Sequence, residues 1–155
     1  MHDDTSKTQI LTSPVTGRAA GLGETPDTYF ASGLMGSGAV LFPQEGRLLA
    51  PCDAVVNFVF PKNMLWVSGR RRGWRVVLQV GIGSNQMDSR CFQPLVDCGC
   101  QVRQGQELLR FDLEAMQQAG ILTATPLVVN RSPQQVHPLA LGNLEAGSAL
   151  LEVTL

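Results

Sequence analysis

Short apolar runs separated by turn-forming residues are the main pattern along this chain. Eight runs of four to seven residues are bounded by Gly, Pro and Asp; they cover residues 39–42, 47–50, 54–60, 64–68, 74–80, 106–111, 127–130 and 149–155. Runs of this length between turn residues are typical of strands, and proline at a run's edge removes no ladder hydrogen bond. The pattern predicts an all-β protein, either an antiparallel β-sandwich or a flattened barrel of many short strands.

One segment carries the signals of a helix instead. Residues 113–119 follow Asp112, a residue suited to the N-cap, and place Glu114 in the positive first turn. Gly120 comes directly after the segment, where a left-handed residue commonly ends a helix. We therefore expect one or two short helical segments within a single domain of residues 10–155, which follows a flexible tail of residues 1–9.

The most regular pair of runs predicts a hairpin. Two β-branched runs flank a turn of Gly and Arg residues. If Arg71 and Arg72 form the tip of this turn, the residue numbers of each cross-strand pair add up to 143. Met64 then lies opposite Gln79, with Cβ atoms about 4.5–5.5 Å apart on one face. Trp66 shares that face with Met64, because side chains alternate along a strand.

Composition excludes several classes of protein. The chain of 155 residues is 44% hydrophobic and 16% charged, with a formal net charge of −1. These values exclude a disordered chain and a strongly nucleic-acid-seeking one. No apolar run approaches the roughly 18 residues of a membrane helix, and the polar N-terminus has no signal-peptide pattern. We expect a cytoplasmic protein with no nucleic-acid partner and no membrane insertion.

Cysteine usage fits a reducing compartment. The four cysteines occur in a chain too long for a small disulfide scaffold. Cys98 and Cys100 form the tightest pair, but a single pair is a weak metal or redox motif, because zinc sites usually combine two spaced Cys pairs or Cys with His. We therefore expect free thiols, and neither a metal site nor a cofactor.

A family resemblance is carried by the second strand of the predicted hairpin. The run Gly73-x-x-Val-Val-Leu-Gln79-Val-Gly-Ile-x-Ser84 resembles the signature of the glucose-type enzyme IIA proteins of the bacterial phosphoenolpyruvate-dependent sugar phosphotransferase system. The resemblance covers residues 10–155 and implies an antiparallel β-sandwich. Further stretches in register are Ser13-Pro-Val-Thr-Gly17, Pro26-Asp27-x-x-Phe30-Ala31, Met35-Gly-Ser-Gly38, Ala50-Pro-Cys-Asp53-Ala54, Val102-x-x-Gly105-Gln106, Phe111-Asp-Leu113 and Thr125-Pro-x-Val-Val129.

The resemblance also shows what this chain lacks. The family has histidines at the positions of Met64 and Gln79: one accepts a phosphoryl group from the carrier protein HPr and passes it to a IIB domain, and the other stabilises it. A neutral imidazole is nucleophilic near pH 7, whereas an amide and a thioether form no stable phosphoryl adduct. Neighbouring positions differ from the family as well, at Lys62, Gly83 and Asn85. The chain is thus expected to have no catalytic residue and to have lost phosphotransferase activity.

A docking surface is the second feature that the resemblance implies. In the family a shallow apolar rim around the histidines binds several partners, among them HPr, IIB domains and permeases. Exposed apolar patches with polar rims mark protein-binding sites. The leading hypothesis is a degenerate enzyme IIA that acts as a protein-binding or regulatory module. The matching positions, with the three hairpin residues added to them, are Phe30, Leu34, Met35 and Phe60, then Met64, Trp66 and Gln79.

Other interpretations stay open from the sequence. A working phosphocarrier could use a relocated acceptor, Cys52 or His137. A binder of small polar ligands could hold a sugar between the Gln79 amide and an apolar floor. The hairpin turn is either a solvated tip or a contact for an acidic partner or an anionic lipid head group. Its charged residues are Arg70, Arg71 and Arg72.

Overall fold

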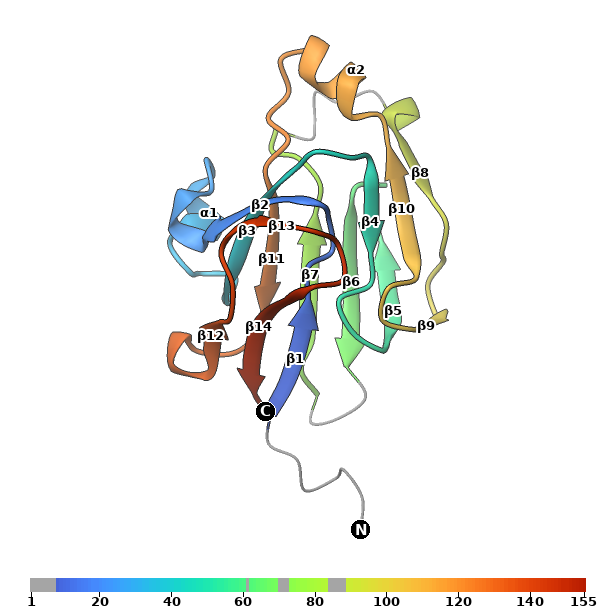
Figure 1. Ribbon diagram of the computed structural model, residues 1–155. Helices are drawn as coiled ribbons and strands as arrows, with labels where there is room; N and C mark the ends of the chain where they lie inside the picture. The colour runs from blue at the N-terminus through green and yellow to red at the C-terminus, as the bar shows by residue number, and fades with distance from the viewer. Residues whose placement is uncertain (1–7, 61, 70–72, 84–88) are drawn as a thin grey trace.

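Two layers of antiparallel sheet make up the protein in its computed structural model, which describes residues 8–60, 62–69, 73–83 and 89–155 (Figure 1). One layer is a single eight-stranded sheet in the order β13-β2-β3-β11-β7-β6-β5-β9. Its strands are β2 (Gly17–Gly21), β3 (Ser37–Pro43), β5 (Ala54–Val59), β6 (Met64–Gly69), β7 (Arg75–Gln79), β9 (Gln101–Val102), β11 (Thr125–Val129) and β13 (Gly142–Leu144).

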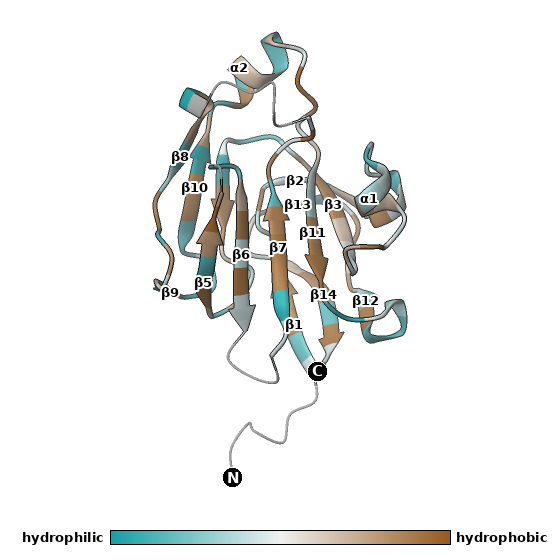
Figure 2. Ribbon diagram, turned by 180° about the vertical axis from the view of Figure 1, so that it is seen from behind, coloured by the Kyte–Doolittle hydropathy of each residue, from teal (hydrophilic) through white to brown (hydrophobic). Residues whose placement is uncertain are grey.

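Two three-stranded sheets form the other layer. One has the order β1-β14-β12 and the other β4-β10-β8, and both lie on the same side of the large sheet (Figures 1 and 2). No sheet closes on itself among the described strands, so the structure is a sandwich and not a barrel. The strands of this layer are β1 (Thr8–Thr12), β4 (Arg47–Leu49), β8 (Phe92–Pro94), β10 (Glu107–Phe111), β12 (Val136–Pro138) and β14 (Ala149–Thr154).

The hydrophobic core fills the space between the layers. Leu11 and Leu151 contribute from the β1-β14-β12 sheet, and Leu65, Leu78 and Leu127 from the large one, all of them without solvent exposure. Figure 2 shows hydrophobic residues over most of β7 and along β11, the two central strands. Apolar burial of this extent is the dominant stabilising contribution to a domain of this size.

The predicted helix is present as α2 (Leu113–Gln118), one residue shorter than expected. Asp112 is its N-cap, since the carboxylate accepts a hydrogen bond of 3.0 Å from the backbone N–H of Ala115. Gly120 follows the C-cap with φ +74°, the left-handed conformation that ends many helices. Both sequence signals are therefore confirmed.

A second, shorter helix precedes β3. In α1 (Thr28–Ala31), the side chain of Asp27 accepts hydrogen bonds from the backbone N–H groups of Tyr29 and Phe30, at 2.8 and 3.3 Å. In the described part of the chain, three further segments are single turns of 3₁₀-helix, at Leu22–Glu24, Ser89–Cys91 and Pro133–Gln135. The fold is thus mostly β with two short helices, as the sequence predicted.

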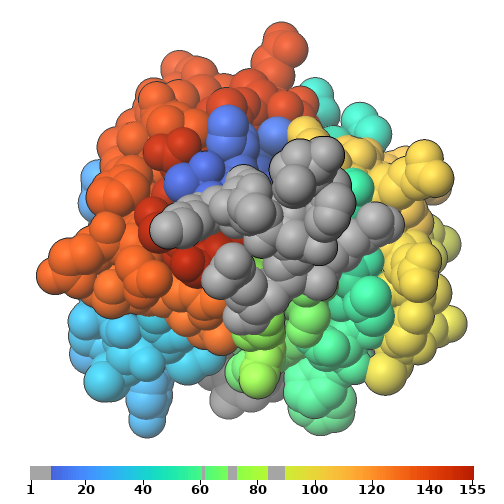
Figure 3. All heavy atoms as spheres, turned by 90° about the horizontal axis from the view of Figure 1, so that it is seen from below, coloured from blue at the N-terminus to red at the C-terminus, as the bar shows by residue number. Residues whose placement is uncertain are grey.

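The predicted runs account for only part of the strands. Each of the eight runs contains a strand, but six strands of the described residues lie outside them: β1, β2, β8, β9, β12 and β13. Thr8 and Gln9, assigned to the tail from sequence, pair with Thr154 and Val153 in β14. Figure 3 shows the first strand, in blue, beside the last, in red. Backbone pairing with β14 therefore orders part of the segment that polarity alone had assigned to the tail.

Candidate functional site

The β6–β7 hairpin places the two family positions opposite each other. Met64 pairs with Gln79, and the register continues through Ser68 and Arg75, so paired residues sum to 143 as predicted. On β6, Leu65 directly follows Met64; it points into the core and is fully buried, while Met64 is half-buried on the outer face. The side-chain alternation predicted from the sequence is confirmed.

Gln79 is buried and its amide is already engaged. The side chain is 7% exposed, and Nε2 donates a hydrogen bond of 3.0 Å to the carbonyl oxygen of Gly81. Gln79 is therefore not a solvated side chain of the outer face. Because the amide satisfies a carbonyl two residues along the chain, it contributes to holding the turn after β7.

Met64 is linked to the aromatic residues beside it. The indole Nε1–H of Trp66 donates to Met64 Sδ at 3.1 Å, a weak hydrogen bond because a thioether is a poor acceptor. Trp66 also meets Phe58 edge-to-face, with ring centroids 5.7 Å apart and an interplanar angle of 63°. Trp66 thus lies on the outer face beside Met64, as the hairpin register predicted.

A buried asparagine fixes the entry to β6. Asn63 is 2% exposed, and its Nδ2 donates a hydrogen bond of 3.0 Å to the carbonyl oxygen of Val80. The backbone N–H of Val80 returns a bond of 2.8 Å to the Asn63 carbonyl. This two-way link holds the start of β6 against the end of β7, and so fixes where Met64 and Gln79 stand.

The rim residues predicted from the family fall into two groups. Phe60 is 68% exposed and its N–H bonds to the Met64 carbonyl at 3.0 Å, so it lies at the same end of the β5–β6 hairpin. Leu34 is 74% exposed and Met35 is half-buried, in the segment between α1 and β3. Phe30 is only 5% exposed and packs inward from α1. Burial therefore removes most of the Phe30 side chain from any contact surface.

The segment that carries Leu34 and Met35 covers the sheet two strands away from β6. A Cβ on Gly36, at φ +131°, would overlap Val129 O and approach Val128 Cγ1 to 2.9 Å, so this segment lies directly on β11. In the sheet order, β7 separates β11 from β6. The docking positions are thus spread over one face of the large sheet. Arg70, Arg71 and Arg72 of the predicted tip lie outside the described residues.

A β-bulge in β5 is a feature that the sequence analysis missed. Val56 pairs with Val67 and Phe58 with Trp66, so Asn57 is an extra residue without a partner. As a result Asn57 and Phe58, though consecutive, are both exposed, and Ser68 Oγ donates to Asn57 Oδ1 at 2.6 Å. The one sequence signal is the polar asparagine that interrupts an apolar run.

This bulge borders a hollow on the outer face of the large sheet. Its lining comes from β5, β6 and β7 and combines two aromatic rings with an amide, a hydroxyl and a guanidinium group. A second hollow meets the first at Ser68 and runs on to Gln101 of β9. The residues lining the first hollow are Asn57, Phe58, Trp66, Ser68 and Arg75.

The alternative phosphoryl acceptors lie in unsuitable surroundings. Cys52 is 2% exposed, and burial together with the nearby charge of Asp53 raises the pKa of its thiol to about 12. His137 is on β12, opposite Glu152 of β14, in the layer that faces away from Met64 and Gln79. A thiol that stays protonated and hidden from solvent is a poor nucleophile.

Cys98 and Cys100 make local hydrogen bonds. Cys98 Sγ donates to the Asn57 carbonyl at 2.9 Å, which holds the bulge, and Cys100 Sγ accepts from the N–H of Asp97 at 3.4 Å. Within the described ranges, no three His, Cys, Asp or Glu side chains gather as a metal site would need. Nor is any described helix long and apolar enough to cross a membrane.

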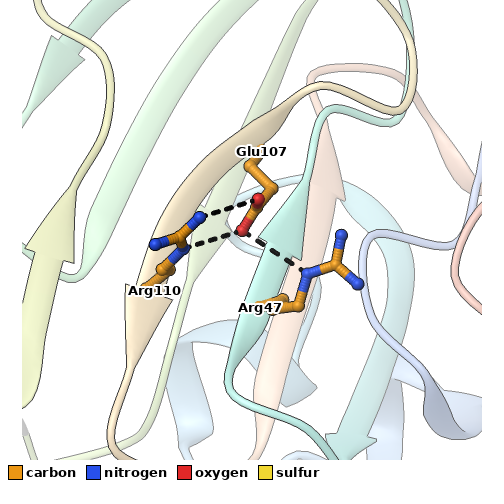
Figure 4. A network of polar contacts seen from close by, with 3 residues as sticks. All are labelled: Arg47, Glu107 and Arg110. Atoms are coloured by element: carbon orange, nitrogen blue, oxygen red, sulfur yellow. Dashed lines mark hydrogen bonds and ion pairs between the residues drawn. The ribbon is translucent and has the colours of Figure 1, made fainter.

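The clearest polar cluster lies in the opposite layer (Figure 4). Glu107 on β10 accepts two hydrogen bonds from Arg110, of 3.1 and 3.2 Å, and one of 3.4 Å from Arg47 on β4. The bond from Arg110, with the charges of both arginines, lowers the pKa of the Glu107 carboxyl. All three side chains meet solvent, so screening limits what these ion pairs add to stability.

Comparison with known proteins agrees with this fold and arrangement. The glucose permease IIA from Mycoplasma capricolum superposes with a TM-score of 0.85 over 95% of this chain and 96% of that one, at 19% identity, so the two proteins share the same β-sandwich fold. The family described as phosphoenolpyruvate-dependent sugar phosphotransferase system, EIIA 1, matches residues 9–135. The chain therefore belongs to this family, and the glucose-type resemblance is confirmed.

Two relatives illustrate the range of similarity. The beta-glucoside-specific EIIBCA component of Dickeya chrysanthemi is 37% identical over 147 residues, which are 94% of this chain and 23% of that protein. The glucose-specific EIIA component of Borreliella burgdorferi is 27% identical over 124 residues, 80% of this chain and 66% of that one. This chain thus spans less than a quarter of the length of the Dickeya relative.

Proposed function

We propose that this chain takes part in sugar uptake by the phosphotransferase system as a cytoplasmic EIIA-like module that binds partner proteins without carrying a phosphoryl group. The observation that supports this is the Met64–Gln79 pair on the outer face, where β6 begins and β7 ends. Both side chains are engaged in hydrogen bonds there, and neither offers the nucleophilic nitrogen on which phosphoryl transfer depends.

The chemistry of the two groups argues against transfer at this site. The amide nitrogen of Gln79 shares its lone pair with its carbonyl, so it donates a hydrogen bond but does not attack phosphorus. The Met64 sulfur has lone pairs, yet a sulfonium-type phosphoryl adduct would be unstable in water. Protonation near pH 7, which lets a second histidine stabilise the phosphoryl group, is also absent from both side chains.

Relocation of the acceptor is disfavoured by the burial of Cys52 and by the place of His137 in the other layer. The direct test is incubation with phosphoenolpyruvate, enzyme I and HPr, followed by intact-protein mass spectrometry. We expect no added phosphoryl group on the wild-type chain while HPr is fully phosphorylated. Stoichiometric phosphorylation at any residue would overturn the proposal.

A gain-of-function variant separates the lost residues from the scaffold. Met64→His/Gln79→His restores an imidazole on each of two directly opposed strand positions. We expect partial phosphorylation of this double variant by phospho-HPr, because the β6–β7 register already brings the two side chains together. The matched control is the pair of single variants, of which Met64→His alone lacks an imidazole at the Gln79 position.

The docking role is best tested at the exposed rim. Phe60→Asp and Leu34→Asp each place a charge on a mostly solvent-exposed side chain, so they leave the core intact. We expect each to weaken binding to HPr or to a IIB domain at least about tenfold, measured by calorimetry. Phe30→Asp is unsuitable because Phe30 is buried. Wild-type protein that binds neither HPr nor a IIB domain would contradict the proposed partners.

A further inference from the structure

The hollow bordered by the β5 bulge is built differently from an apolar docking rim. Of its five lining residues, three are polar, and these stand beside two aromatic rings. Ligand sites of small molecules have this composition: apolar surface for contact area and a few polar groups for orientation. Bulges are also found beside binding sites, because they turn an additional side chain toward the ligand.

The hydrogen bonds already made leave this hollow rich in donors. Asn57 Oδ1 receives the Ser68 hydroxyl proton, and the Asn57 Nδ2 group has no acceptor within the described part of the chain. The guanidinium of Arg75, directly across from Ser68, has no ion-pair partner among the residues described. An amide NH₂ and a guanidinium together offer up to seven N–H donors by their chemistry, about five of them on the arginine.

The aromatic side of the hollow offers an accessible flat surface. Phe58 is 47% exposed and Trp66 is half-buried, and their edge-to-face packing holds the indole in place. A rigid aromatic surface is suited to the apolar C–H face of a pyranose ring, and its ordering costs little because the neighbours already fix the rotamer. Polar groups on one side of that surface would meet the ring's oxygens.

We propose that this hollow binds a pyranose sugar that carries an anionic group such as a phosphate. The indole of Trp66 packs against the ring, Asn57 Nδ2 donates to ring hydroxyl oxygens, and the guanidinium of Arg75 binds the anion bidentately. No acidic residue lines the hollow among the described positions, so nothing there repels a negative charge. This inference goes beyond the proposed function and does not rest on it.

The test uses the indole N–H signals of the two tryptophans in proton–nitrogen NMR correlation spectra. Trp74 is 2% exposed and serves as an internal reference, and Trp66→Phe identifies the Trp66 signal. Wild-type protein is titrated separately with glucose 6-phosphate, glucose and inorganic phosphate. We expect a saturable shift of the Trp66 signal with glucose 6-phosphate, a weaker response to glucose, and an unchanged Trp74 signal.

Variants assign the contacts within the hollow. Arg75→Gln is expected to reduce affinity for glucose 6-phosphate about tenfold, and to remove its preference over glucose, because a charge-assisted hydrogen bond is lost. Arg47→Gln, in the opposite layer, is the matched control and leaves both affinities unchanged. Asn57→Ala weakens the binding of both sugars, since its amide contacts the ring and not the anion.

Three outcomes would overturn the inference. One is the absence of a saturable shift with glucose 6-phosphate at about 10 mM, a concentration at which even a very weak site fills. The second is an equal response to inorganic phosphate, which would define a plain anion site without sugar recognition. The third is unchanged binding in Arg75→Gln, with circular dichroism confirming that the variant is folded. None of these results bears on phosphoryl transfer, so the proposed function is tested separately.

Discussion

At the scale of single residues, Gln79 determines which chemistry the outer face can support where β6 begins and β7 ends. Its amide is buried and donates to Gly81, so the side chain acts as a structural link and not as a free polar group. Removing a buried donor leaves its acceptor unsatisfied, at a cost set by desolvation. Gln79 therefore supplies no nucleophile for phosphoryl transfer, and the fold requires a hydrogen-bond donor at its position.

This requirement predicts the effect of Gln79→Glu. The new carboxylate would face the Gly81 carbonyl oxygen, acceptor against acceptor, so the free energy of unfolding at pH 7 falls by about 1–3 kcal/mol in urea titrations. The loss becomes smaller near pH 4, where a protonated acid can donate instead. Gln93→Glu on the exposed part of β8 is the control and changes stability little. An equal loss in both variants would contradict this role for Gln79.

Cys52 gives a prediction for alkaline pH. The pKa of its thiol is about 12 in the folded protein, against an ordinary value of 9.0, so the unfolded chain releases the proton first as pH rises. The contribution of the protonated Cys52 thiol to the free energy of unfolding is complete below pH 9. It is lost between pH 9 and 12, by up to about 1.4 kcal/mol per pH unit. Unfolding free energy measured at pH 8 and pH 10 therefore falls more in wild type than in Cys52→Ala. Parallel changes in the two proteins would exclude the effect.

At the scale of elements, the local sequence pattern was sufficient to predict some strands and insufficient to predict others. The β6–β7 hairpin was predicted with its register because alternation and the turn both point to one pairing, and Met64 opposite Gln79 followed. The helix α2 was predicted from its caps. In contrast, β2 (Gly17–Gly21) consists of Gly, Arg and Ala, residues without strand propensity, and its pairing with β3 comes from tertiary contacts.

The candidate site was less predictable than the fold for a physical reason. The family positions could be located along the chain, but whether a side chain is exposed depends on what packs over it. Phe30 proved to be buried, and the amide of Gln79 is buried and bonded to the Gly81 carbonyl. The bulge at Asn57 adds one residue to β5 without a turn signal, so the hollow beside it could not be read from periodicity.

Close approach between strands predicts the effect of adding one methyl group. A Cβ on Gly38 of β3 would overlap the Leu127 carbonyl oxygen of β11, and backbone atoms in mid-sheet have little room to move. Gly38→Ala therefore lowers the free energy of unfolding by more than about 2 kcal/mol, in chemical denaturation. Gly21→Ala on β2 is the matched control, because nothing lies within 4 Å of its Cβ position. Similar stabilities for the two variants would contradict this account.

At the scale of the whole molecule, the first and last strands complete the second layer together. Leu11 of β1 pairs with Leu151 of β14, and both are fully buried against the large sheet. The layer that supports the outer face from behind therefore depends on contacts between the two ends of the described chain. Stability of the candidate site and of the terminal strands is coupled through this shared core.

This coupling predicts a global effect from a terminal residue. Leu11→Ala removes buried methyl groups and lowers the free energy of unfolding by about 2–5 kcal/mol. Ile10→Ala, the adjacent residue with 47% exposure, is the control and costs less than about 1 kcal/mol. The indole signals of Trp66 and Trp74 are expected to lose intensity at one common denaturant midpoint in each variant. Separate midpoints would show that the layers unfold independently.

The extra residue in β5 has a consequence for how this strand tolerates changes in length. Val56 already faces Val67 and Phe58 already faces Trp66, so deleting Asn57 would join two correctly paired segments into a regular ladder. Deleting Val56 instead would leave Asn57 to fill a core position. Deletion of residue 57 is thus expected to destabilise the fold mildly, and deletion of residue 56 severely. Asn57 marks a point where the gene can shorten without a shift in strand register.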